Sequence, residues 1–389
     1  MHLATKKQYG QFFTKESDYI LQGLEPFIAG KNVTDPFAGA GDLLDWAKRH
    51  RARLIVGYDV DGNYCDQCRI YCSDSLLTPK SYEFVITNPP YLNINKAGAD
   101  IKKKYFQQTK FEDLYQLALY SLLDSQEGIV IVPINFLSAE NAETIRRYFF
   151  EKFEIVRMNY FRQPVFADTT YNVIAFYYRK KTHNNAKQIA IETVIFPENQ
   201  TVLIELDADS GWTIGGDAIA PIKNCKNRLG IYRLTEEHIK RGNIAIAAAY
   251  NHISTKTTLY VDYPTYNLIH SNIILLNAID SGSEEGKVRL EDIRKYSIEC
   301  LVSKPTSRHQ IYLVFGNPIS IEEQLDLIRE FNALLKQLRE KYLSLFMTNY
   351  RDKDRKRISF DFVYKMINYL YYQRSGKHLG KIVFFTQNF

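Results

Sequence analysis

The chain has 389 residues, of which 45% are apolar and 24% are charged, a composition typical of a soluble globular protein with two ordinary domains. No apolar run approaches the roughly 20 residues that a membrane-spanning helix needs, and the N-terminus lacks the apolar segment of a secretory signal. The five cysteines, an odd count, predict no disulfide framework and fit a reducing compartment. We therefore expect a cytoplasmic protein without membrane association.

The net charge of +6 is unevenly placed along the chain. Residues 331–389 contain 12 Lys and Arg against 4 Asp and Glu, a net charge of +8, and they are rich in Tyr and Phe. A basic segment with many aromatic residues is expected of a protein that binds nucleic acid. A solvated basic surface would show the same charge, so charge by itself leaves both interpretations open.

The first part of the chain alternates strand and helix signals. A short strand, a glycine-containing turn and a helix are predicted within residues 32–50. Further strands are predicted at 53–61, 82–88, 128–137, 154–161 and 172–181, and a helix at 138–153 with Ser138 as its N-cap. The runs at 82–88 and 128–137 are almost entirely apolar, as in parallel strands that are buried on both faces. The pattern predicts a doubly wound, Rossmann-like α/β sheet over about residues 20–180.

The alternation ends after Lys181. Short strands, turns and loops follow, and residues 317–346 predict one long amphipathic helix with Ser320 and Glu323 as a capping box at its start. We expect a second, C-terminal α+β domain.

The stretch "DPFAGAGD" at residues 35–42 has the character of a ligand-binding turn. Gly39 and Gly41 let a ligand approach the backbone, and the helix that follows offers free N–H groups. Asp59 lies about 20 residues further on, at a predicted strand end, where a carboxylate can accept hydrogen bonds from ribose hydroxyls. Asp74, in "CSDSL", falls at another predicted strand end and suits the amino group of adenine. Together these residues predict a site for a nucleoside-containing cofactor.

The stretch "FVITNPPYLN" at residues 84–93 ends a predicted strand with two prolines, which cannot continue a sheet ladder. A rigid corner therefore presents Asn88 and Tyr91. The side-chain oxygen of Asn88 and the carbonyl of Pro89 can accept the two hydrogens of a planar amine and direct its nitrogen lone pair at an electrophile. Tyr91 offers a flat surface for stacking. The corner suits a planar amine or a planar amide equally.

The order of these motifs resembles that of the AdoMet-dependent DNA adenine-N6 methyltransferases of restriction-modification type II systems. The similarity is to the gamma-type arrangement, in which the cofactor motifs precede the target-recognition region. It covers roughly residues 8–180. The matching segments are, in order, "QYGQFFT", "DPFAGAG", "VGYDVD", "SDSL", "NPPY", "DLYQLALYSLL", "GIVIVPINFL" and "RQPVFADTTYNVIAFYY".

The resemblance implies S-adenosyl-L-methionine (AdoMet) as cofactor and an adenine that is flipped out of duplex DNA as substrate. It implies Asn88, Pro89 and Tyr91 as catalytic residues, with Tyr91 and Phe166 holding the flipped base. The implied cofactor-binding residues are Thr14, Asp35, Phe37, Gly39, Gly41, Asp59, Val60, Asp74, Ser75 and Asn88. One position departs from the family: where members often carry an aromatic residue that closes over the cofactor adenine, this chain has Leu117 or Ala118.

The resemblance also implies an AdoMet-binding catalytic domain at residues 1–180 and a DNA target-recognition domain at residues 181–389. The expected partners are double-stranded DNA, which would place a cytoplasmic monomer at the nucleoid, and a cognate restriction endonuclease that acts separately. The expected phosphate contacts are Arg351, Lys353, Arg355, Lys356 and Arg357. Two alternatives stay open: a methyltransferase of ribosomal RNA or of a protein glutamine, and a catalytically idle DNA-binding protein.

Three closely spaced cysteines, Cys65, Cys68 and Cys72, lie between the two acidic strand ends. Their spacing runs opposite to that of the iron–sulfur enzymes that use AdoMet, and no fourth ligand lies near them in the sequence. We expect three thiols beside the adenine pocket and no metal.

Overall fold

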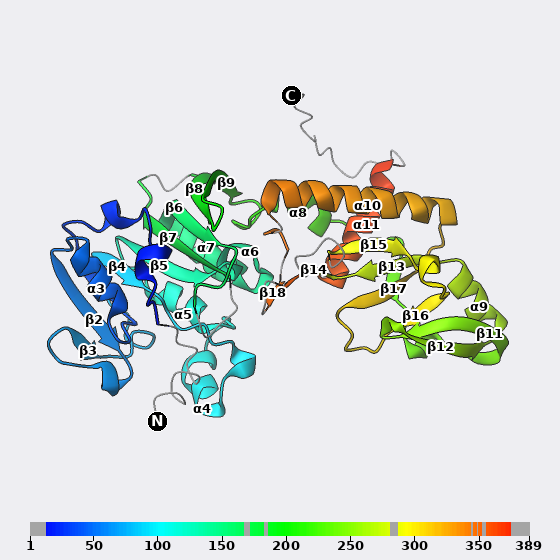
Figure 1. Ribbon diagram of the computed structural model, residues 1–389, viewed down its shortest axis with the longest axis horizontal. Coiled ribbons are helices and arrows are strands. Elements are labelled where there is room, and N and C mark those ends of the chain that lie inside the picture. The colour runs from blue at the N-terminus through cyan, green and yellow to red at the C-terminus, as the bar shows by residue number, and fades with distance from the viewer. Residues whose placement is uncertain are drawn as a thin grey trace. The chain divides into compact units, whose positions relative to one another are not determined.

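The computed structural model describes residues 13–166, 172–182, 186–280, 287–343, 345–347, 349–351 and 355–374 (Figure 1). These residues form two compact units. The first unit consists mainly of the chain up to Gly216, and the second consists mainly of the chain from Asp217 onward. Each unit has its own sheets and helices.

A nine-stranded sheet forms the first unit, in the order β3-β2-β1-β4-β5-β7-β6-β8-β9. Strands β1 to β5 run parallel to one another, whereas β7 is antiparallel to both β5 and β6. The strands are β1 Asn32–Asp35, β2 Leu54–Asp59, β3 Ile70–Cys72, β4 Phe84–Thr87, β5 Glu127–Pro133, β6 Phe153–Phe161, β7 Val173–Lys180, β8 Gln188–Phe196 and β9 Gln200–Asp207.

The connections change direction between β1 and β4, which is the switch point of a doubly wound sheet. Because parallel crossovers are right-handed, the helices on the two sides of this point cover opposite faces of the sheet. Strands β4 and β5 are buried along almost their whole length, as their apolar runs predict. The helices are α2 Ser17–Ile20, α3 Asp42–Arg49, α4 Ala99–Ile101, α5 Leu114–Ser121, α6 Asn135–Ser138 and α7 Glu143–Lys152, with short turns η1 Glu25–Phe27, η2 Gly62–Tyr64, η3 Ile94–Lys96, η4 Lys102–Phe106 and η5 Glu140–Ala142.

The single helix expected at 138–153 is wrong in its first turns. Helix α6 ends at Ser138, the turn η5 follows, and α7 begins only at Glu143. The Ser138 hydroxyl donates to the Ile134 carbonyl within α6, so Ser138 is not the N-cap of a following helix. The first unit also extends past the expected limit at residue 180, because β8 pairs in parallel with β6, and β9 pairs antiparallel with β8.

The second unit contains a four-stranded sheet in the order β10-β17-β13-β15 and a three-stranded sheet in the order β12-β11-β16. Its long helix α10 Ile321–Tyr342 begins with the predicted capping box: the Ser320 hydroxyl accepts from the Glu323 N–H, and the Glu323 carboxylate accepts from the Ser320 N–H. Buried side chains of α10, including Leu327 and Phe331, pack in one core with the four-stranded sheet.

The remaining elements of this part of the chain are α8 Gly216–Lys223, β10 Ile231–Arg233, η6 Glu236–His238, β11 Arg241–Tyr250, β12 His252–Val261, α9 Tyr263–His270, β13 Ile274–Asn277, β14 Ile279–Asp280, β15 Arg289–Asp292, η7 Ile293–Tyr296, β16 Cys300–Val302, β17 Gln310–Phe315, β18 Asn349–Arg351, β19 Arg355–Arg357 and α11 Phe360–Arg374. The predicted fold class, a Rossmann-like α/β domain followed by an α+β domain, is confirmed. Within the described ranges, no helix has the length and apolar character to cross a membrane.

Candidate active site

A cavity that is partly open to solvent lies where β1, β2, β3 and β4 end. This is the edge of the sheet, beside the switch point, at which doubly wound folds bind ligands. Its lining contains nine of the predicted cofactor residues: Thr14, Asp35, Phe37, Gly39, Asp59, Val60, Asp74, Ser75 and Asn88. Gly41, the tenth, does not line the cavity and instead forms the N-cap of α3.

The glycine turn after β1 is held against the end of β2. Gly39 and Gly41 both have positive φ, at +50° and +88°, a backbone region that non-glycine residues rarely adopt. The Gly39 N–H donates to the Asp59 carboxylate at 2.8 Å, and the Asp61 N–H donates to its other oxygen, also at 2.8 Å. Burial raises the pKa of Asp59, against the lowering effect of these N–H groups. The turn and the acidic strand end therefore form one unit with fixed geometry.

Asp35, at the end of β1, connects this turn to the strand before Asn88. One of its oxygens accepts from the Phe37 N–H at 3.0 Å and from the Thr87 hydroxyl at 2.8 Å. Burial raises the pKa of Asp35 to about 7, with a smaller contribution from the nearby Asp59 carboxylate. Asp35 thus holds the ends of β1 and β4 together, and its charge depends on pH near neutrality.

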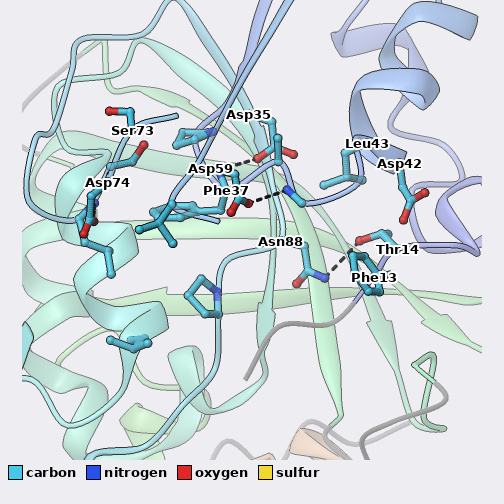
Figure 2. Close-up of a pocket in the computed structure, with 18 of the residues that line it drawn as sticks. Phe13, Thr14, Asp35, Phe37, Asp42, Leu43, Asp59, Ser73, Asp74 and Asn88 are labelled. Carbon is cyan, nitrogen blue, oxygen red and sulfur yellow. Dashed lines mark hydrogen bonds between the residues drawn. The ribbon is translucent and has the colours of Figure 1, made fainter. Parts of the chain in front are cut away.

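Asn88 lines the cavity directly after β4, and its side chain is held at both ends. Its amide nitrogen donates to the Thr14 hydroxyl at 3.1 Å, a contact that Figure 2 shows across the cavity. Its amide oxygen accepts from the Tyr91 hydroxyl at 2.6 Å. That hydroxyl also lies 3.1 Å from the Ile131 carbonyl, a second acceptor for the same proton. In this orientation the amide oxygen faces Tyr91 and the amide nitrogen faces Thr14.

The structure places Tyr91 differently from the sequence expectation. The Tyr91 side chain is buried, only 4% exposed, with its ring edge-on to Tyr115 and its hydroxyl at Asn88. It does not line the cavity, because the hydroxyl bonds turn the ring inward. Phe166 is also buried and outside the lining, as is Pro89, whereas Pro90 lines the cavity. In this structure Asn88 alone of the predicted catalytic residues faces the cavity.

An aromatic residue that the sequence reading missed lines the cavity at its Asp74 end. Tyr105, from the π-helical turn η4, donates its hydroxyl to the Asp74 carboxylate at 2.8 Å. The neighbouring Lys104 forms an ion pair with the same carboxylate at 2.7 Å. Leu117 and Ala118, the expected position of the missing aromatic residue, do not line the cavity. Other lining residues absent from the prediction are Phe13, Pro36, Ala38, Asp42, Leu43, Ser73, Leu76, Pro90 and Leu114.

The arrangement of the lining fits the cofactor that the sequence implies. In Figure 2, Ser73 and Asp74 lie at one end of the cavity, Thr14 and Asp42 lie at the other, and Asp35 and Asp59 lie between them. An adenine amino group, ribose hydroxyls and a positively charged methionine portion need acceptors in that order. The hydrogen-bond acceptors that line this cavity therefore fit AdoMet along its length.

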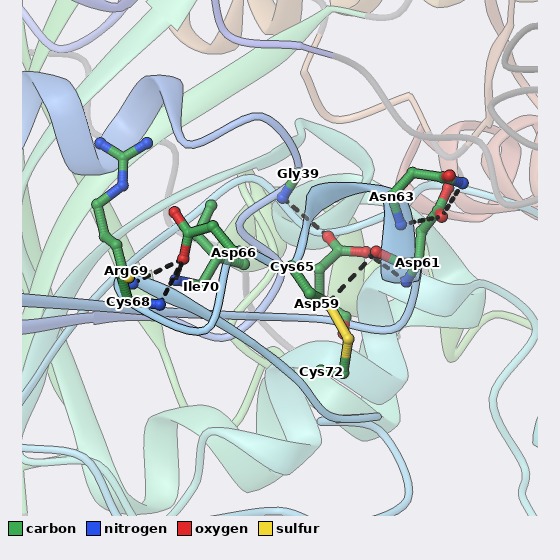
Figure 3. The surroundings of a disulfide bond; sticks show 10 residues. All are labelled: Gly39, Asp59, Asp61, Asn63, Cys65, Asp66, Cys68, Arg69, Ile70 and Cys72. Atoms are coloured by element: carbon green, nitrogen blue, oxygen red, sulfur yellow. Dashed lines mark hydrogen bonds between the residues drawn. A yellow bond between two sulfur atoms is a disulfide. The ribbon is translucent and has the colours of Figure 1, made fainter.

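The expectation of three thiols is wrong for two of them. Cys65 and Cys72 form a disulfide, and Cys68 is free and exposed (Figure 3). The two residues meet because the chain turns back after η2, so that Cys72 ends β3 beside the segment that carries Cys65. Within the described ranges, no group of three or more His, Cys, Asp and Glu residues is placed to hold a metal ion.

The predicted basic segment is only partly described. Lys353 and the side chains of Arg351 and Arg355 lie outside the described structure. Lys356 is 8% exposed and lies opposite Asp280 in the pairing of β14 with β19. Lys356 is therefore largely buried in this structure, in contrast to the exposed position that a phosphate contact needs. Arg357 is half-buried, with its guanidinium 5.4 Å from the ring centre of Phe360.

A hollow in the second unit combines aromatic and basic side chains. It is lined by Tyr232, Arg233, Thr235, Glu237, His238, Pro305, Phe360 and Tyr364, which we call the basic–aromatic groove. The Arg233 guanidinium lies 5.9 Å from the ring centre of Phe360 and donates to the Pro305 carbonyl at 2.8 Å. Two exposed cations, Lys304 and Arg308, flank Pro305 in the same loop, and Arg308 donates to the Pro305 carbonyl at 3.0 Å. Sequence motifs give no sign of this site.

The doubly wound sheet, with the glycine turn at its switch point and the Asn-Pro-Pro-Tyr corner beside it, gives the first unit a Rossmann-like fold. Residues 42–166 match the model of one family, the Eco57I restriction-modification methylases. The similarity to restriction-modification methylases that the sequence motifs predict is thereby confirmed for this part of the chain.

Several solved structures are similar to parts of the chain. The modification subunit of a putative type I restriction enzyme from Vibrio vulnificus YJ016 is 17% identical over 49% of this chain and 48% of its own, with a TM-score of 0.37. The type I methyltransferase subunit from Streptococcus thermophilus is 18% identical over 50% of each chain, with a TM-score of 0.34. The type IIG restriction endonuclease BpuSI is 11% identical over 93% of this chain and 59% of its own, with a TM-score of 0.46. The chain thus spans about half the length of the first two proteins. Comparison with curated protein sequences finds no match.

Proposed function

We propose that this protein transfers the methyl group of AdoMet to N6 of an adenine that is flipped out of duplex DNA, as the modification enzyme of a restriction-modification system. The observation that carries the proposal is the position of Asn88. Its side chain lines the cavity whose acidic strand ends and glycine turn fit AdoMet, with its oxygen oriented as an acceptor. An acceptor at that point suits a planar amine next to a methyl donor.

The exocyclic amine of adenine is a weak nucleophile because its lone pair is delocalised into the ring. An N–H donated to the Asn88 oxygen draws the nitrogen toward tetrahedral geometry and localises that lone pair. The Tyr91 hydroxyl occupies the Asn88 oxygen here, and it has the Ile131 carbonyl as a second acceptor. Rotation of one hydroxyl proton therefore leaves the Asn88 oxygen to the substrate. Bound AdoMet supplies the electrophilic methyl group.

Thr14 supports the same geometry from the opposite side. Its hydroxyl accepts from the Asn88 amide nitrogen and so holds the end of the amide opposite to Tyr91. Thr14 also lines the cavity at the end that suits the methionine portion of AdoMet. We therefore assign it to positioning both the cofactor and Asn88. For Tyr91 the hydrogen bonds favour a positioning role over the stacking role, which requires the ring to leave its buried site.

The proposal that the protein binds duplex DNA rests on the positive charge of the second unit. The exposed cations beside the basic–aromatic groove suit the phosphates of a DNA duplex, and the aromatic side chains suit its sugars and bases. A cognate restriction endonuclease that acts as a separate protein belongs to the same proposal.

The test is transfer of labelled methyl from AdoMet to duplex DNA, followed by identification of the modified nucleoside by mass spectrometry. We expect the label on N6-methyladenine. Ribosomal RNA and a glutamine-containing peptide are offered in parallel reactions. Label on RNA or peptide without label on DNA would refute the DNA substrate and favour one of the alternative methyltransferases. Binding of DNA without transfer to any substrate would favour a catalytically idle DNA-binding protein.

A further inference from the structure

The disulfide between Cys65 and Cys72 lies directly beside the cofactor cavity. Cys72 is the register partner of Asp59 in the parallel pairing of β2 and β3. The next residue, Ser73, donates its N–H to the Asp59 carbonyl at 2.9 Å, and both Ser73 and Asp74 line the cavity. The chain on the C-terminal side of the disulfide therefore runs straight into the end of the cavity that suits adenine.

The other half of the disulfide contacts the same strand end. The Cys65 sulfur lies 3.8 Å from the Asp59 carbonyl and 3.5 Å from the Asp61 carbonyl. Asp61, in turn, donates its N–H to the Asp59 carboxylate, as Figure 3 shows. The covalent bond thus links the loop that orients Asp59, the expected ribose acceptor, to the strand that leads to Asp74, the expected adenine acceptor.

The strand that carries Cys72 is short and lies at an edge of the sheet. It is three residues long, with Tyr71 and Cys72 exposed. Short edge strands open at low free-energy cost. The turn between the two cysteines has its own support, because the Asp66 carboxylate accepts from the N–H groups of Cys68, Arg69 and Ile70. Breaking the disulfide would therefore leave the turn formed and loosen its attachment to the cavity.

We propose that Cys65 and Cys72 form a redox site that sets the affinity for the cofactor, with the disulfide form as the tight-binding state. The identity of that cofactor as AdoMet rests on the proposed function. Cys72 is exposed and Cys65 is half-buried, so an incoming thiolate reaches the Cys72 sulfur first. In a reducing compartment, disulfides of this accessible kind serve redox sensing more often than structural support.

The co-reactant is a dithiol reductant. One of its thiolates attacks the Cys72 sulfur, the sulfur–sulfur bond breaks, and Cys65 leaves as a thiolate that takes up a proton. The second thiol of the reductant then attacks the mixed disulfide and releases Cys72 as a thiol. Two electrons and two protons pass to the protein, and the reductant leaves as a disulfide.

The experiment measures AdoMet affinity by calorimetry on the full chain, in an oxidised sample and in a sample reduced with excess dithiothreitol. Peptide mapping by mass spectrometry without reductant establishes the linkage. We expect a Cys65–Cys72 crosslink and an affinity that falls about three- to tenfold on reduction, since a site that is competent only part of the time loses affinity by that fraction. The paired variant Cys65→Ser with Cys72→Ser should show the weaker affinity whether or not reductant is present.

Cys68→Ser is the matched control, because it removes an exposed thiol of the same turn and leaves the disulfide in place. This variant should keep the full response to reductant. Equal AdoMet affinity in the oxidised and reduced wild-type protein would overturn the inference while leaving the proposed function standing, and so would a crosslink that involves Cys68. Failure of both forms to bind AdoMet would contradict the proposed function, and the inference with it. Circular dichroism of the reduced protein separates loss of affinity from loss of fold.

Discussion

The candidate sites of the two units differ in how far they can be predicted from the sequence. In the first unit, the polar groups of the site follow directly after strands β1, β2 and β4, so each appears in the sequence as a short motif behind an apolar run. In the second unit, the residues of the basic–aromatic groove come from β10 and η6, a loop near Pro305 and the start of α11, which together span more than a hundred residues of chain. No short pattern marks such a site.

The difference follows from what each site is proposed to do. Transfer of a methyl group requires a few atoms in fixed positions, and a parallel sheet supplies these at adjacent strand ends. Contact with a polyanion requires only that cations gather on one surface, and many chain positions can satisfy that. The first kind of site is therefore local in sequence, and the second kind is visible only after folding.

The largest effect on methyl transfer is expected from substitution of Asn88, the residue of the first unit that a short sequence motif marks most clearly. Replacing Asn88 with Ala removes the acceptor for the target amine and should lower methyl transfer about a hundredfold to a thousandfold. AdoMet binding should change little, because the strand-end acceptors of the cavity remain. Single-turnover transfer to DNA and calorimetric titration with AdoMet measure the two quantities separately.

Asn95→Ala is a suitable control for this change, since Asn95 lies in the adjacent turn η3 and outside the cavity lining. Wild-type turnover in Asn88→Ala would rule out the proposed role of the amide oxygen. Loss of AdoMet binding in the same variant would mean that Asn88 shapes the cavity rather than the reaction.

The second effect tests whether the basic–aromatic groove of the second unit is the DNA-binding surface. Lys304→Ala together with Arg308→Ala removes two exposed cations beside Pro305. DNA affinity at low salt should fall about tenfold, and the slope of log affinity against log salt should become shallower by about two. Fluorescence anisotropy over a salt series measures both, and AdoMet affinity should stay unchanged.

A charge-matched control lies on α10. Arg329→Ala together with Lys336→Ala removes one Arg and one Lys whose side chains are 73% and 79% exposed, and neither lines the groove. This control should bind DNA nearly as the wild type does. Equal losses in the two double variants would mean that net charge, and not the groove, determines binding.

The sequence was sufficient for strands β1, β2, β4 and β5 of the first unit and for the polar residues at their ends. Apolar runs that end in Asp35, Asp59 and Asn88 are local signals, and the structure brings these three residues to one cavity. Tyr105 escaped prediction because it reaches the cavity from a π-helical turn that lies between two motifs. The burial of Tyr91 escaped it because the direction of a side chain depends on distant acceptors, here the Ile131 carbonyl.

The limits of prediction in the rest of the chain have the same origin. Cysteine spacing carries no information on whether β2 and β3 bring Cys65 to Cys72, so the disulfide was unforeseen. Strands β8 and β9 follow a polar break that resembles a linker, yet β8 pairs with β6 and extends the first sheet. The helix α10 was predictable because its capping box and apolar face lie in one continuous segment.

A smaller effect, on AdoMet affinity, is expected from substitution of Tyr105, the lining aromatic residue that the sequence motifs did not predict. Tyr105→Ala removes a ring from the Asp74 end of the cavity and should weaken AdoMet binding about fivefold. Tyr105→Phe keeps the ring, loses only the hydroxyl bond to Asp74, and should show a smaller loss. The ratio of the two affinities, measured by calorimetry, separates ring contact from hydrogen bonding. Unchanged binding in both variants would remove Tyr105 from the cofactor site.

The smallest effect concerns stability rather than turnover, and it arises from the buried carboxyl of Asp35. Its pKa is raised by burial from 3.8 to about 7, so the folded protein holds a proton there that the unfolded chain releases. Stability is therefore lost as pH rises through this range, and it levels off above pH 7. The nearby Asp59 carboxylate adds to the shift.

Asp35→Asn removes this titration and keeps an oxygen for the Phe37 N–H and the Thr87 hydroxyl. The free energy of unfolding of the variant, relative to that of the wild type, should therefore be larger at about pH 8 than at about pH 5, so the variant gains relative stability as pH rises. Urea unfolding of both proteins at the two pH values measures the difference. A relative stability that does not change with pH would show that Asp35 is ionised throughout. The first unit would then carry a permanent negative charge between its glycine turn and Asn88, and the lower affinity for AdoMet expected of the neutral Asn variant would measure how strongly that charge attracts the cofactor.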